Sequence, residues 1–163
     1  RAFLVAEIAK ACFEKKLPVT FQVVGDIEPP QELKNNSSIV FTGELTDMEK
    51  LKDIYKNADA LLITSEREGF PMAIMEGMAY GVIPVSTPVG DIPKHIRSGE
   101  TGYLTSSIEP QQVITEMVNY ISILIHEKEK RLVMSKRVFE YAKEHFSKEK
   151  FTKAYRTLLT KFE

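Results

Sequence analysis

Short apolar segments alternate with helical patterns along the first two thirds of the chain. The apolar segments, which we expect to form β-strands, occupy 19–24, 38–43, 58–65, 82–86 and 102–105. Helical patterns are predicted at 3–16, 46–56, 71–80, 91–98, 109–126, 129–144 and 147–162. Apolar strands separated by helices are typical of a parallel sheet that is covered on both sides. The predicted fold class is therefore α/β, a Rossmann-like parallel sheet with helices on both faces.

The composition is that of a globular protein and excludes several classes of protein. Of the 163 residues, 43% are apolar and 28% are charged, and the net charge is -1, so no basic field draws the chain to nucleic acid. The single cysteine, Cys12, excludes a disulfide framework and the usual cysteine-based zinc site. The histidines share no metal-ligand spacing. No apolar run approaches the ~20 residues of a membrane span, so we expect no transmembrane segment and a cytoplasmic location.

Several residues mark the boundaries of helices and the edge where a ligand should lie. Thr46, with Glu49 three residues later, predicts a capping box. Pro71 suits the first turn of a helix and Gly81 its left-handed end. Ligands of parallel α/β sheets bind at the carboxyl ends of the strands. In this chain those ends are predicted at 25–26, 43–44, 65–70 and 87–91.

Glu76 is the one charged side chain in the predicted helix at 71–80. Its neighbours are apolar on all sides, which predicts a buried helix. A buried carboxylate without a partner costs several kcal/mol, so Glu76 must face either a structural partner or a ligand, and the helix alone favours neither. Gly77 beside it indicates close approach by another group.

The loop before this helix favours the ligand. Glu68 and Gly69 stand between a strand end and a helix start, where unpaired amides and the helix dipole favour an anion. Two carboxylates, one on the loop and one in the helix, can accept hydrogen bonds from paired hydroxyl groups such as those of a sugar.

The run that contains both glutamates resembles a known signature. Glu68, seven intervening residues and Glu76, set in Glu-Gly-Phe-Pro-Met-Ala-Ile-Met-Glu-Gly-Met-Ala-Tyr-Gly, resemble the donor site of retaining GT-B glycosyltransferases of group 1. Further similar segments lie at 23–26, 39–43, 58–65, 87–96, 99–104 and 145–150. The resemblance covers essentially the whole chain. It implies that residues 1–163 are the nucleotide-sugar-binding, C-terminal half of a GT-B fold.

The resemblance also implies roles for individual residues. Glu68 would lie near the sugar hydroxyls as the catalytic candidate, and Glu76 would bind the ribose hydroxyls. Backbone amides that would meet the sugar and the diphosphate belong to Gly69, Phe70, Met72 and Ala73. The turn formed by Gly43, Glu44 and Leu45 would lie against the base. The glycines Gly25 and Gly90 would let the backbone approach the ligand closely. The implied substrate is a UDP-, GDP- or ADP-linked sugar, transferred with retention by a hexosyltransferase type of enzyme that needs no cofactor and no obligatory metal.

Two residues depart from the family pattern. Pro71 stands where glycine is frequent, which removes one amide donor. Asp91 stands where a second glycine is frequent, and its carboxylate would repel a diphosphate unless it points away.

The resemblance implies that other parts of the family pattern lie upstream of Arg1. They are the first strand of the sheet, an arginine and a lysine of the phosphate site, and the acceptor-binding N-terminal domain. We therefore expect a fragment whose strands at 19–24 and 60–64 are separated by a gap or by an upstream segment, and which is inactive alone. The helix at 147–162 would cross to the missing domain. The acceptor would be a glycan or a lipid-linked glycan, which would allow peripheral contact with the inner membrane.

Two other functions remain open at this point. One is a non-catalytic module that binds a sugar nucleotide for a partner. The other is a GT-B epimerase, which ranks last because its acids and histidines are not found at the matching places.

Overall fold

The computed structural model describes residues 1–160, and the last two residues of the predicted final helix, 161 and 162, lie outside them. The helices are α1 (Ala2–Glu14), η1 (Gln31–Leu33), α2 (Met48–Asn57), α3 (Met72–Ala79), α4 (Ile92–His95), α5 (Pro110–His126), α6 (Lys128–His145) and α7 (Lys148–Leu159). The strands are β1 (Phe21–Val24), β2 (Ile39–Gly43), β3 (Ala60–Ile63), β4 (Ile83–Ser86) and β5 (Tyr103–Leu104). The predicted order of elements is confirmed.

The strands form two separate parallel sheets. One contains β1 and β2, and the other has the order β3-β4-β5. In the second sheet Ala60 pairs with Ile83 and Ile63 with Ser86. Within residues 1–160 no strand pairing joins β1 to β3, so the predicted gap is confirmed. The α/β fold class is confirmed with it.

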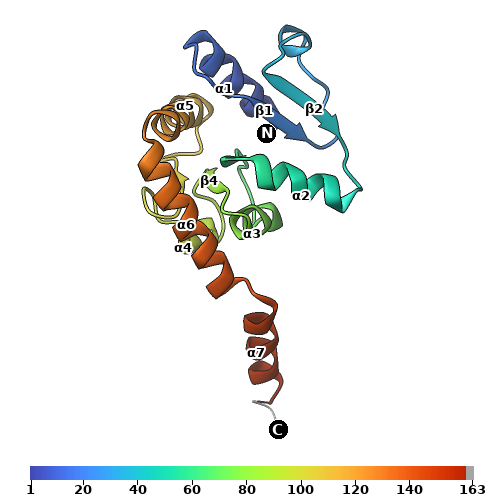
Figure 1. Cartoon of the computed structure of the whole chain (residues 1–163), viewed down its shortest axis with the longest axis vertical. Helices are drawn as coiled ribbons and strands as arrows, with labels where there is room; N and C mark the ends of the chain where they lie inside the picture. Colours follow the sequence, from blue (N-terminus) through green and yellow to red (C-terminus); the bar gives the residue numbers. More distant parts are fainter. Residues whose placement is uncertain (161–163) are drawn as a thin grey trace.

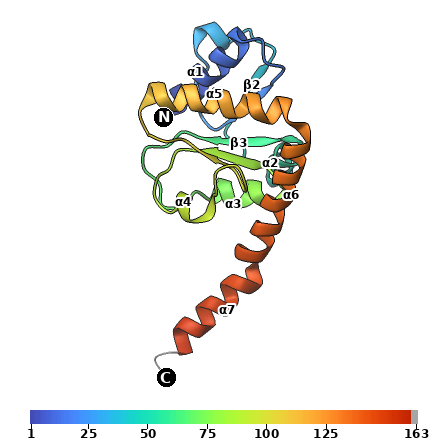
Figure 2. The same ribbon diagram turned by 90° about the vertical axis from the view of Figure 1, so that its left-hand side faces the viewer.

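Helices cover both faces of the β3-β4-β5 sheet. Figure 2 shows α5 along one face and α3 and α4 along the other, with α1 on the outer side of α5. The central strand β4 is buried at every position. Ile83 and Val85 of this strand belong to the same core as Ile74 of α3 and Met117 of α5. Burial of such side chains stabilises the fold by about 1.5–3 kcal/mol each.

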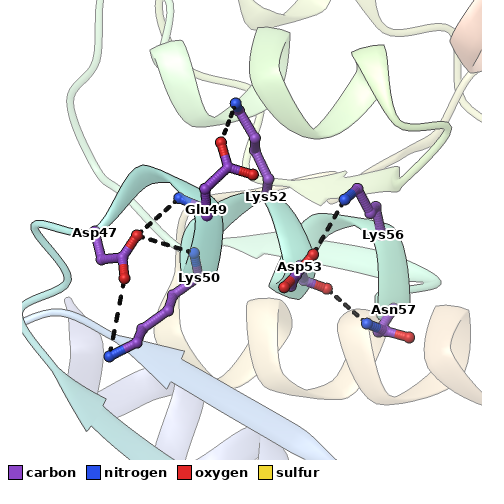
Figure 3. A network of polar contacts seen from close by, with 7 residues as sticks. All are labelled: Asp47, Glu49, Lys50, Lys52, Asp53, Lys56 and Asn57. Atoms are coloured by element: carbon purple, nitrogen blue, oxygen red, sulfur yellow. Dashed lines mark hydrogen bonds and ion pairs between the residues drawn. The ribbon is translucent and has the colours of Figure 1, made fainter.

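The cap of α2 differs from the prediction. Asp47, and not Thr46, is the N-cap residue, and its Oδ1 accepts hydrogen bonds from the amides of Glu49 at 3.0 Å and Lys50 at 3.4 Å (Figure 3). Aspartate is at least as good an N-cap as threonine, which accounts for the shift by one residue. The ion pairs Lys52–Glu49 and Lys56–Asp53 on this helix are exposed, and such pairs add little stability.

Helix α3 is buried on one face only, so the prediction of burial on all sides is wrong. Ile74, Gly77 and Met78 are buried, whereas Met72 is 67% and Tyr80 39% exposed. The helix packs on β4 and α6, and Tyr55 of α2 lies against it at Gly77. The predicted end is confirmed: Gly81 has φ +76°, and the Ser135 hydroxyl donates to its carbonyl oxygen at 2.7 Å.

Helix α7 extends away from the body of the molecule (Figures 1 and 2). None of its residues is buried. Its large apolar side chains are exposed, namely Phe151, Tyr155, Leu158 and Leu159. Among the helices described, none is both long enough and apolar enough to span a membrane.

Candidate functional site

The loop between β3 and α3 carries the first glutamate of the motif and is tied to the end of β4. The amide of Thr87 donates to the carbonyl oxygen of Ile63 at 3.0 Å. The hydroxyl of Thr87, which is fully buried, donates to the carbonyl oxygen of Ser65 at 2.6 Å. The carboxyl ends of the two strands are therefore held together, as expected for neighbours in a parallel sheet.

Gly90 brings the loop after β4 against the loop after β3. Its φ is +57°, and a Cβ at this position would overlap the carbonyl oxygens of Glu68 and Gly69. The next amide, that of Asp91, donates to the Gly69 carbonyl oxygen at 2.8 Å. Gly90 therefore contacts the motif loop, and its approach to a ligand stays a prediction. Gly69 is exposed, and a Cβ there would meet nothing within 4 Å.

Glu68 is an exposed carboxylate on this loop. The Ser65 hydroxyl donates to its Oε1 at 2.6 Å. Within residues 1–160 its Oε2 accepts no hydrogen bond. One carboxylate oxygen is held and the other is open to a ligand.

Glu76 is half-buried on α3, and its partner comes from another helix. The Tyr55 hydroxyl of α2 donates to Glu76 Oε2 at 3.0 Å. Among its described contacts Glu76 accepts no hydrogen bond from a backbone amide outside the helix or from a lysine. Burial, and then the hydrogen bond to Glu76 and its charge, raise the pKa of Tyr55 to about 12. The phenol therefore remains a donor throughout the physiological pH range.

The first turn of α3 lies at the end of the motif loop. Met72 is exposed and Ala73 is half-buried. In the described part of the chain, neither of their amides donates a hydrogen bond to a group outside the helix. Such unpaired amides and the helix dipole favour an anion.

Phe70 anchors the loop in an aromatic cluster. Its ring lies 4.5 Å from that of His95 and 5.4 Å from that of Phe146, centroid to centroid. His95 Nδ1 is 3.1 Å from the Tyr141 hydroxyl oxygen. Burial lowers the pKa of His95, and the Asp91 carboxylate opposes that shift. These contacts give His95 a packing role.

The carboxylate of Asp91 is paired with a cation. Lys94 Nζ lies 2.7 Å from Asp91 Oδ1 on the surface. The hydrogen bond from Lys94 holds the pKa of the Asp91 carboxyl below its usual value. The pairing offsets part of the repulsion that the sequence predicted between this carboxylate and a diphosphate.

The remaining predicted residues lie on the other sheet. The amide of Gly25 donates to the Gly43 carbonyl oxygen at 2.9 Å, and both residues have positive φ, +126° and +70°. Glu44 is exposed and Leu45 half-buried. No hydrogen bond within residues 1–160 joins this turn to the loops at 65–70 and 87–91. The structure thus brings Glu68, Gly69 and Gly90 together, and no hydrogen bond among the described residues joins the Gly25–Gly43 pair to them.

Tyr55 contacts Glu76 and was not predicted, whereas Thr87 lies in the strand end predicted at 87–91. Tyr55 lies four residues after Leu51 on α2, and this spacing places both on one helix face. That pattern indicates an inward-facing tyrosine but not its partner. Among the described residues no group of three or more His, Cys, Asp or Glu side chains could hold a metal ion.

A parallel α/β sheet with this loop and helix is the architecture of the C-terminal domain of GT-B glycosyltransferases. The C-terminal domain of a group 1 glycosyl transferase from Francisella tularensis (LpcC) superposes with a TM-score of 0.76 at 22% identity, over 89% of this chain and 78% of that one. The Anabaena protein Alr3699/HepE, solved with UDP, gives 0.77 at 21% identity, over 94% of this chain and 44% of that one.

The chain belongs to the glycosyl transferases group 1 family, whose model matches residues 2–123. A curated relative, N-acetyl-alpha-D-glucosaminyl L-malate synthase of Bacillus anthracis, is 30% identical over 120 residues, or 74% of this chain. The matched region spans 30% of the length of that relative.

Proposed function

We propose that the chain is the donor-binding domain of a retaining glycosyltransferase, which transfers a sugar from a nucleoside diphosphate sugar to a glycan or lipid-linked acceptor. The observation that carries the proposal is the pair of loops joined at Gly90, which holds Glu68 beside the first turn of α3. Membership of the group 1 family supports sugar transfer. UDP in the Anabaena complex favours UDP over GDP and ADP as the first nucleotide to test.

Each part of the site has a role in this proposal. The open oxygen of Glu68 accepts a sugar hydroxyl, and Glu76 accepts the ribose hydroxyls. The amides of Gly69, Met72 and Ala73 meet the diphosphate, whose charge the N-terminus of α3 stabilises. Phe70 fixes the loop between these groups through its contacts with His95 and Phe146.

A second domain completes the enzyme in this proposal. The exposed apolar face of α7 supports it, because such a face is expected to pack on another surface. We expect residues 148–159 to lie against the acceptor-binding domain. The isolated chain then turns over donor slowly or not at all, because the acceptor site lies elsewhere. An ordinary turnover rate from the 163-residue chain would contradict this division of roles.

Calorimetric titration with UDP, GDP and ADP tests the proposal. We expect one nucleotide to bind, and Glu76→Ala to weaken that binding about 10- to 100-fold, because hydrogen bonds to a charged group contribute ~1.5–3 kcal/mol. Glu140→Ala, on the exposed side of α6, is the matched control and should bind like the parent chain. No binding of any nucleotide would overturn the proposal. If the full-length protein binds UDP but does not transfer sugar, the chain is a non-catalytic binding module.

A further inference from the structure

Tyr55 is nearly buried, at 9% exposure, and its hydroxyl reaches out of α2 to a carboxylate on α3. The two residues are 21 positions apart, so the contact depends on how the two helices pack. Tyr55 donates to Oε2 of Glu76, and Oε1 of Glu76 accepts no hydrogen bond within residues 1–160. The carboxylate is therefore fixed through one oxygen only.

The ring of Tyr55 is held on two sides. A Cβ at Gly77 would lie 3.6 Å from Tyr55 Cε1, so the ring lies directly against the backbone of α3. On another side it stacks with Tyr80, with centroids 5.9 Å apart and an interplanar angle of 13°. A ring packed in this way presents its hydroxyl in one direction. The donor to Glu76 is therefore set before any ligand arrives.

The partner of Glu76 is neutral. Within the described part of the chain no lysine, arginine or histidine forms an ion pair with Glu76, and its side-chain hydrogen bond comes from the Tyr55 hydroxyl. A cation would compete with incoming hydroxyl groups for the carboxylate charge, whereas a phenol leaves that charge in place. If packing alone were required, phenylalanine at 55 with an apolar residue at 76 would satisfy it without placing a carboxylate beside the core.

We propose that Tyr55 is a positioning residue for nucleotide recognition, which orients Glu76 so that its second oxygen accepts the paired 2′ and 3′ hydroxyls of a ribose. The inference rests on the proposed function, in which Glu76 binds the nucleotide. In this proposal Tyr55 of α2 does not touch the ligand, yet the preference for a ribose over a sugar that lacks one or both of these hydroxyls depends on it.

The test compares UDP with 2′,3′-dideoxy-UDP in calorimetric titrations of the full chain. Tyr55→Phe removes the hydroxyl and keeps the ring. We expect it to weaken UDP binding about fivefold, the effect of one ordinary hydrogen bond, and to leave dideoxy-UDP binding unchanged. Tyr120→Phe is the matched control and should bind UDP like the parent chain, because it also removes one tyrosine hydroxyl, which donates to the Leu104 carbonyl oxygen at 3.0 Å and not to Glu76. In a Glu76→Ala background, Tyr55→Phe should have no further effect.

The outcomes separate this inference from the proposed function. A parent chain that binds no nucleotide overturns both. A parent chain that binds UDP, with Tyr55→Phe binding it equally well, overturns the role of Tyr55 alone. Equal weakening of UDP and dideoxy-UDP would show a general packing effect and also overturn it. Thermal unfolding of each variant checks that the fold is retained.

Discussion

The two glutamates of the motif are held in different ways. Glu68 is exposed on a loop, and its partner Ser65 is three residues away in the sequence. Glu76 is half-buried on α3, and its partner Tyr55 comes from another helix. The orientation of Glu68 therefore depends only on a neighbour in the same loop, and a ligand can change it at a small cost in free energy. The orientation of Glu76 depends on where Tyr55 of α2 lies relative to α3.

The backbones around the two residues show the opposite contrast. The loop that carries Glu68 touches Gly90 so closely that no side chain fits between them. The helix that carries Glu76 leaves ordinary van der Waals space at Gly77. The backbone of the loop therefore has no room for an added side chain at Gly90, while the Glu68 carboxylate on this loop can reorient. In α3 the backbone can accept a methyl group at Gly77, while the Glu76 carboxylate is held in one orientation by Tyr55.

The largest effect is expected for Gly90→Ala. The added methyl group overlaps two carbonyl oxygens and occupies a left-handed conformation, so we expect a loss of about 3 kcal/mol or more in the free energy of unfolding, together with loss of UDP binding. Urea unfolding measures the loss. Gly99→Ala is the matched control, because Gly99 has φ +84° but open space around its Cβ position; it should lose only ~1–2 kcal/mol. Equal losses for both variants would show that the contact between the loops contributes nothing.

Gly77→Ala tests the tolerance of α3. A methyl group there would lie 3.4 Å from Leu61 Cδ2 and 3.6 Å from Tyr55 Cε1, which are normal contacts. Alanine is a better helix former than glycine by ~1 kcal/mol, so we expect stabilisation of about 0.5–1 kcal/mol in urea unfolding. UDP affinity should be unchanged. A destabilisation above ~1 kcal/mol would mean that this helix is packed as tightly as the loop.

Ser65→Ala should have the smallest effect. It removes the donor to an exposed carboxylate, and we expect less than ~0.5 kcal/mol loss in the free energy of unfolding. UDP affinity should fall by less than for Tyr55→Phe, because Glu68 can reorient once the donor is lost. Titration of both variants under one buffer makes the comparison. If Ser65→Ala weakened UDP binding more than Tyr55→Phe does, Glu68 and not Glu76 would be the carboxylate whose orientation depends on its protein partner.

Much of the fold follows from the sequence because its signals are local. Pro71 and Gly81 bracket α3 within one or two residues of its observed ends, and the apolar run at 82–86 contains the fully buried β4. The break between the two sheets was also predicted. The exposure of Met72 was not, because apolar composition does not say which face of a helix remains uncovered.

The sequence predicts which segments form the site, but it does not predict which residues within those segments contact one another. Glu76 stands out in the sequence by its apolar surroundings, and Glu68 by its position on the loop, with seven residues between the two. The partner of Glu76 does not, since a pair separated by 21 residues depends on the relative position of two helices. The same applies to Gly90, whose positive φ is suggested by its residue type, while the backbone it touches is known only from the fold.

The edges of the two sheets have a practical consequence for handling the chain. β1 and β3 each have one side without a pairing strand within residues 1–160. An unpaired edge is a template for a strand from another molecule. We therefore expect the purified chain to associate increasingly as its concentration rises. Titrations that place dilute protein in the cell and concentrated nucleotide in the syringe keep this association from imitating a change in affinity.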